Sequence, residues 1–131
     1  MSGTTNTRLL FRISAVVEIL TGFGFLAAPA LIIGLLLGEG VSTVGIAVAR
    51  VLGIGLLSVG VAAWEPQEQS IRLAPRAGLC IYNVGVAALL AIVGTTAGMH
   101  APLLWPAVGL HGLIGALMLW VISMHYRNNN S

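Results

Sequence analysis

Charged residues are scarce in this chain: only 8% of its 131 residues are charged, and lysine and aspartate are absent. An average soluble domain has about 25% charged residues. With 57% hydrophobic residues, the chain carries more apolar surface than a soluble fold of this length can bury. These proportions exclude an ordinary soluble domain and predict a protein that is solvated by lipid.

The residues needed for metal, cofactor or nucleic-acid binding are also few. The single cysteine, Cys80, excludes a disulfide within the chain, and a scattered net charge of +2 does not indicate a nucleic-acid surface. His111 and His125 share a helix face, but a haem site would need partner histidines on another helix. No Cys/His group has the spacing of a zinc site, and no glycine-rich loop follows a strand. We therefore expect neither a metal nor a cofactor.

What the sequence has instead is four long apolar stretches, each near the roughly 20 residues that cross a bilayer as a helix. They predict an all-α, polytopic integral membrane four-helix bundle that occupies residues 1–131 as one transmembrane domain. The expected spans are about 9–28, 44–64, 77–98 and 104–124.

The first apolar run is too long for one span. From Leu9 to Gly38 it would extend roughly 45 Å at about 1.5 Å per residue, against a hydrocarbon core of roughly 30 Å. Pro29 is expected to end the first span, and residues 30–37 to form a short interfacial or re-entrant helix. Residues 28–30 resemble a signal-peptidase site, but Glu18 interrupts the apolar run, so we interpret the first helix as uncleaved.

The arginines predict the orientation. In a four-span topology, the arginines outside the second span all lie on one side of the membrane: Arg8, Arg12, Arg72, Arg76 and Arg127. The positive-inside rule places both termini and the loop 65–76 in the cytoplasm. Short loops and a basic set made only of arginine are typical of a GC-rich bacterial gene, so we expect a bacterial inner (plasma) membrane.

Small residues recur four apart within the spans, as at Ala49 and Gly53, Gly94 and Gly98, and Gly112 and Ala116. Such spacing lets helices pack closely. Because four helices leave much surface facing the lipid bilayer, we also expect a homo-oligomer or a partner subunit in the membrane.

Polar residues at membrane depth are the candidates for function. Glu18 lies ten residues after Arg8, about 15 Å into the membrane, and Arg50 lies roughly 9 Å from the opposite face. An unpaired charge there costs on the order of 3 kcal/mol or more, so a Glu18–Arg50 pair is the cheapest way to bury both. Such a pair would either only hold the first two helices together or also form part of a binding site.

The remaining two spans each add polar residues. Tyr82 and Asn83 enter the third span, and His111 enters the fourth. Each is also explained as an interhelical hydrogen-bonding residue. Their occurrence in successive helices predicts one polar pocket with the ligand-binding residues Glu18, Arg50, Tyr82, Asn83 and His111, in which Glu18 is also the candidate acid, base or proton site.

The order Arg12 to Pro29, followed by Ala49-Arg50-x-Leu52-Gly53 at the start of a glycine-rich second helix, resembles the small bacterial DoxX-like four-helix membrane proteins. That resemblance, mainly in the first half, implies the four-helix topology and a role as a subunit of a membrane oxidoreductase complex or a role not yet assigned.

In length, number of spans and a glutamate in the first helix, at Glu18, the chain is also similar to the small multidrug resistance transporters. This similarity implies a dimeric, proton-coupled exporter. A pair with Arg50 would neutralise the carboxylate that such a transporter must leave free to titrate.

Three hypotheses follow, and the residues leave open whether the protein is an enzyme. The first is a protein, by itself or as a subunit, that binds a quinone or another apolar, lipid-like metabolite in the polar pocket. The second is the dimeric exporter. The third is an intramembrane acid–base isomerase or cyclase of a hydrophobic substrate, in which Glu18 transfers the proton. A Glu18–Arg50 contact would weaken the second and third hypotheses.

Overall fold

The computed structural model describes residues 2–64, 73–98 and 101–129. In these ranges the chain forms five helices and no strand: α1 (Ser2–Ala27), α2 (Pro29–Leu37), α3 (Thr43–Trp64), α4 (Leu73–Thr96) and α5 (Leu104–Asn129). Four of them contain stretches long and apolar enough to cross a membrane, at Thr7–Ala27, Thr43–Trp64, Ala77–Thr96 and Leu104–Met124. The prediction of an all-α chain with four such helices is confirmed, which indicates a multi-pass membrane protein.

Helix ends differ from the expected ranges mainly where the sequence is polar. Helix α1 begins at Ser2, so the polar residues before position 9 are helical. Helix α4 begins at Leu73, within the expected loop 65–76. The helix accommodates Pro75 because this residue falls in the first turn, where its missing N–H has no partner to lose. Residues 65–72 of that loop lie outside the described ranges.

Pro29 separates the first two helices as the sequence predicts. Ala28 is not helical, with φ −141° and ψ 59°, and Pro29 is the first residue of α2. The short helix ends at Gly38, which adopts the left-handed conformation with φ 76° and donates its N–H to the Gly34 carbonyl at 2.9 Å. A glycine suits this position because a Cβ is disfavoured at positive φ.

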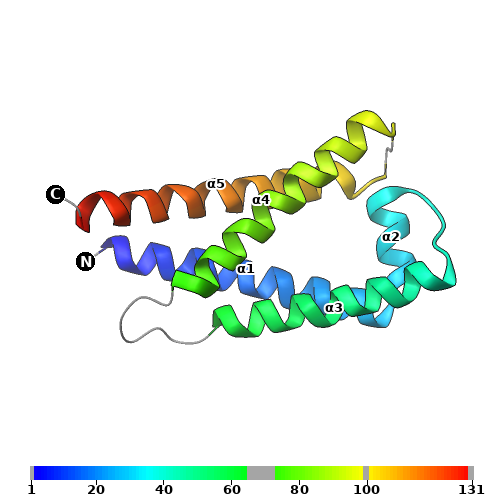
Figure 1. Cartoon of the computed structure of the whole chain (residues 1–131), viewed down its shortest axis with the longest axis horizontal. Coiled ribbons are helices and arrows are strands. Elements are labelled where there is room, and N and C mark those ends of the chain that lie inside the picture. Colours follow the sequence, from blue (N-terminus) through cyan, green and yellow to red (C-terminus); the bar gives the residue numbers. More distant parts are fainter. Residues whose placement is uncertain (1, 65–72, 99–100, 130–131) are drawn as a thin grey trace.

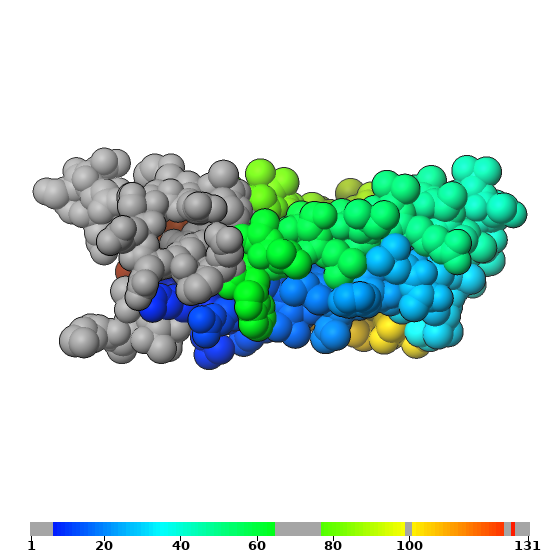
Figure 2. Space-filling view, turned by 90° about the horizontal axis from the view of Figure 1, so that it is seen from below, coloured from blue at the N-terminus to red at the C-terminus, as the bar shows by residue number. Residues whose placement is uncertain are grey.

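The four long helices form two antiparallel pairs, α1 with α3 and α4 with α5 (Figure 1). Contacts within each pair are far more extensive than contacts between the pairs. Figure 2 shows α3 lying against α1 along one face of the molecule. The bundle is therefore two tightly packed hairpins joined by a thinner interface.

Small residues allow the close approach of α1 and α3. A Cβ added to Gly22 would lie 2.8 Å from the Gly53 carbonyl oxygen, and one added to Gly53 would lie 2.8 Å from the Gly22 carbonyl oxygen. Two turns further, a Cβ on Gly60 would lie 2.9 Å from the Ala15 carbonyl oxygen. Backbone therefore meets backbone across this pair, as the small residues at Ala49 and Gly53 predict.

Helix α2 lies across one end of the bundle, where it contacts α1, α3 and α5 (Figure 1). The Leu103 N–H, just before α5, donates to the Leu35 carbonyl of α2 at 3.0 Å. Gly38 faces Ala101, which is 6% exposed. The short helix thus ties the first hairpin to the second at this end.

Two apolar clusters fill the interior. One is built from residues near the amino-terminal end of α1 and from α3, α4 and α5: Phe11, Ala15, Ala63, Leu79, Cys80, Ile114 and Met118. The other lies towards α2 and contains Phe25, Ala49 and Leu56. Glu18 comes between the α1 members of the two clusters in sequence, so apolar layers flank it on both sides.

Candidate functional site

Four polar side chains are buried among the described residues. Ser14 and Glu18 come from α1, Asn83 from α4 and His111 from α5. Residues four apart lie on the same helix face, and both Ser14 and Glu18 point toward the second hairpin, where Ser14 contacts Asn83 and Glu18 approaches His111. We call these four residues the polar cluster; it lies at the interface between the two hairpins.

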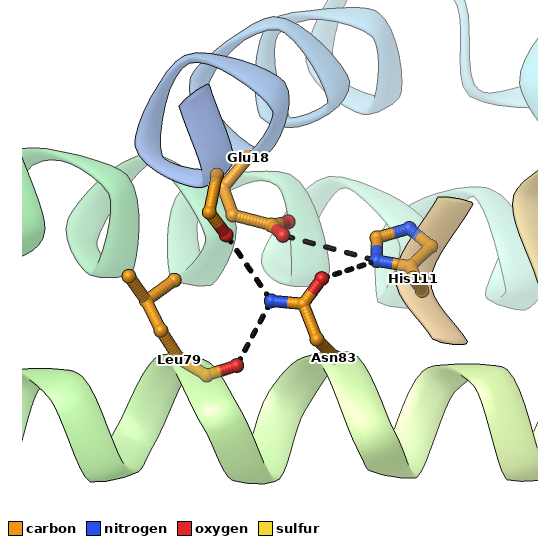
Figure 3. Close-up of polar contacts among 5 residues, drawn as sticks. Glu18, Leu79, Asn83 and His111 are labelled. Atoms are coloured by element: carbon orange, nitrogen blue, oxygen red, sulfur yellow. Dashed lines mark hydrogen bonds and ion pairs between the residues drawn. The ribbon is translucent and has the colours of Figure 1, made fainter. Parts of the chain in front are cut away.

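Asn83 is the centre of the polar cluster (Figure 3). Its Nδ2 donates to the Leu79 carbonyl at 2.9 Å and to Ser14 Oγ at 3.2 Å. Its Oδ1 lies 2.9 Å from Nδ1 of His111. One amide side chain therefore links three helices, with both N–H groups and the carbonyl in use.

Glu18 is placed differently. Its side chain is fully buried, and neither Oε1 nor Oε2 has a hydrogen-bond partner among the described residues. The nearest basic group is His111, whose Nδ1 lies 4.0 Å from Oε1. The Tyr82 hydroxyl interacts electrostatically with the carboxyl group without reaching hydrogen-bonding geometry. Unmet hydrogen-bonding capacity on a buried carboxyl group is rare, because each such group costs about 1–3 kcal/mol or more.

Arg50 is not part of the polar cluster. Its side chain is exposed, and within the described ranges it forms no ion pair. The expected Glu18–Arg50 pair is therefore not formed. The reason lies in α3, whose buried face is made of small residues and one leucine: Ala49, Gly53, Leu56, Gly60 and Ala63. Successive helix positions differ by about 100°, so packing Ala49 against α1 turns Arg50 outward.

The other predicted site residues do come together. Asn83 and His111 are hydrogen-bonded, and Tyr82 is half-buried with its ring edge-on to His111, at a centroid separation of 5.7 Å and an interplanar angle of 81°. Sequence reasoning missed Ser14. The available signal was its position one turn before Glu18, which puts both side chains on one face of α1.

A metal site is not apparent: the described residues contain no group of three or more His, Cys, Asp and Glu side chains that could hold a metal ion. Cys80 is buried in an apolar cluster. The side chain of His125 lies outside what the structure describes.

Comparisons with known proteins return nothing: no family model, no curated protein and no solved structure matches this chain.

Proposed function

We propose that this protein binds an apolar, lipid-like small molecule within the membrane and holds the polar end of that molecule at the polar cluster. The observation that carries the proposal is Glu18, a fully buried carboxyl group with no hydrogen-bond partner on either oxygen among the described residues. The neighbouring amide of Asn83 uses both of its N–H groups and its carbonyl oxygen, so it supplies no hydrogen bond to Glu18.

A bound molecule would remove this deficit. Binding sites are mainly apolar with a few polar groups that fix the orientation of the ligand, and the polar cluster between two apolar layers has that composition. The thin interface between the hairpins offers a way in, because parting α1–α3 from α4–α5 breaks few contacts. The polar end of the ligand would then meet Glu18 and its apolar body would lie among the helices.

Native mass spectrometry of protein purified in detergent tests this proposal. We expect the wild type to carry a small molecule that Glu18→Gln loses, since glutamine keeps the shape of the side chain but changes its hydrogen bonding. Glu39→Gln, on an exposed carboxyl group in the α2–α3 connection, is the matched control and should retain the molecule. The same bound mass in all three proteins, or none in any, would refute the proposal. The masses also give the number of protein chains in each complex, and we expect more than one chain, either as a homo-oligomer or with a partner subunit.

Acid–base catalysis is the second candidate, and the separation of Arg50 from Glu18 favours it. With no arginine beside it to hold it ionised, the buried carboxyl group of Glu18 is free to take up or release a proton of a bound molecule. An isomerase or cyclase of this kind would exchange a carbon-bound hydrogen of the bound molecule with solvent. In D₂O we expect deuterium to enter the ligand with the wild type and not with Glu18→Gln. No exchange with the wild type would rule this candidate out.

We also propose that both termini face the cytoplasm of a bacterial inner membrane and that α2 is interfacial or re-entrant at the opposite face. The support is the distribution of arginines. Cys80 is 5% exposed and should be inert, so single cysteines can be added. A membrane-impermeant maleimide should label Gly40→Cys from outside intact spheroplasts but should label Ser131→Cys only after lysis. The reverse pattern would invert the topology.

A further inference from the structure

The hydrogen bonds of Asn83 determine which nitrogen of His111 carries a proton. A backbone carbonyl can only accept, so the group of Asn83 that lies 2.9 Å from the Leu79 carbonyl must be the NH₂ group. The contact with Ser14 Oγ uses the second N–H. The atom facing His111 is consequently the amide oxygen, and the orientation of the amide is fixed by the backbone of α4.

An amide oxygen accepts only, so Nδ1 of His111, 2.9 Å away, must be the donor. In a neutral imidazole with its proton on Nδ1, Nε2 carries a lone pair. Nε2 points away from Asn83 (Figure 3). His111 is 6% exposed, whereas the other three members of the polar cluster are fully enclosed. His111 is thus the least enclosed member of the polar cluster.

We infer that Asn83 is a positioning residue that holds the proton of His111 on Nδ1, so that Nε2 serves as a hydrogen-bond acceptor for the ligand. The T-shaped contact with Tyr82 helps to fix the plane of the ring. The part of this inference that concerns the ligand rests on the proposed function. It requires that the polar end of the ligand donate a hydrogen bond. A lipophilic phenol or alcohol fits that requirement, whereas a quinone, which only accepts, does not.

The tautomer is tested by NMR of protein with ¹⁵N-labelled histidine, because a protonated and an unprotonated ring nitrogen have well-separated chemical shifts. His111→Gln identifies the His111 signals among the three histidines. We expect a proton on Nδ1 and none on Nε2 in the wild type. Asn83→Leu, which removes the acceptor, should move the proton to Nε2 in a large fraction of the molecules.

Ser14→Ala is the matched control. It removes one partner of Nδ2 but leaves the Leu79 carbonyl to orient the amide, so the wild-type tautomer should persist. If Asn83→Leu does not fold, the wild-type and Ser14→Ala spectra still show which nitrogen of His111 carries the proton. A wild-type His111 with its proton on Nε2, or on both nitrogens, overturns the inference.

The requirement for a ligand that donates a hydrogen bond is tested with two probes, 1-naphthol and 1-methoxynaphthalene, in the second of which a methyl group replaces the hydroxyl hydrogen. We expect 1-naphthol to shift the Nε2 resonance and to bind at least about tenfold more tightly, which corresponds to about 1.4 kcal/mol. Equal affinities would overturn the donor requirement. The tautomer is measured without ligand, so a confirmed tautomer with no Glu18-dependent ligand in the mass spectra would refute the proposed function and leave the role of Asn83 intact.

Discussion

Gly53→Val is expected to push α1 and α3 apart and to lower the free energy of unfolding by about 3 kcal/mol or more. A Cβ at this position would lie 2.8 Å from the Gly22 carbonyl oxygen and 3.2 Å from the Leu26 amide nitrogen, both of them backbone atoms of α1. Backbone cannot swing aside as a long side chain can. The whole hairpin must therefore open, and because α1 carries Glu18, the polar cluster is displaced with it.

Gly55→Val is the matched control for this prediction. Gly55 lies on the same helix two residues away, is exposed, and has no atom within 4 Å of an added Cβ. Both variants change helix propensity equally, so the difference between them isolates the contact with α1. Unfolding of the detergent-solubilised protein by a titration with sodium dodecyl sulfate measures the difference. Equal losses in the two variants would show that the close Gly22–Gly53 approach does not hold the hairpin together.

Asn83→Leu is expected to have the second-largest effect on stability, a loss of about 1–3 kcal/mol. Leucine is similar in size but forms none of the hydrogen bonds to Ser14, Leu79 and His111. Interhelical hydrogen bonds in membrane proteins average about 0.6 kcal/mol, and a buried donor left unpaired costs about 1–3 kcal/mol. The bond to Ser14 joins α4 to α1 across the thin interface between the hairpins, and the contact with His111 joins α4 to α5 within the second hairpin, so the substitution weakens both.

Thr95→Val is the control on the same helix. Thr95 is exposed, and its hydroxyl bonds only to carbonyls of α4, at Ala91 and Ile92. It should change stability by no more than about 0.5 kcal/mol. The same unfolding titration compares the two variants. If Asn83→Leu unfolds no more readily than Thr95→Val, the polar cluster makes no contribution to joining the hairpins.

The sequence predicts the fold of this chain well because lipid imposes strict requirements. A span must have about 20 apolar residues, and a proline that follows such a run ends it, so four long helices and the break at Pro29 can be predicted from composition and position alone. Helix ends are harder to predict. The polar residues at the start of α1 and the first turn of α4 lie outside the apolar runs, and no lipid requirement determines whether they are helical.

The candidate site was predictable only in part. Asn83 and His111 stand out because any polar residue in an apolar run is conspicuous. The predicted Glu18–Arg50 pair was wrong because it rested on charge and depth alone. The small residues Ala49 and Gly53 determine which face of α3 packs against α1, and packing that face turns Arg50 outward. Ser14 was missed because a serine in a membrane helix is usually satisfied by its own backbone.

The central claim is that Glu18 is buried to meet a ligand and does not hold the helices together. The most direct measurement is the free energy of unfolding of ligand-free Glu18→Gln against the wild type. Because no described residue hydrogen-bonds to Glu18, the variant should be as stable as the wild type, within about 0.5 kcal/mol, or more stable. A loss of about 3–5 kcal/mol, the effect of breaking a buried charge pair, would contradict the claim and make Glu18 a structural residue.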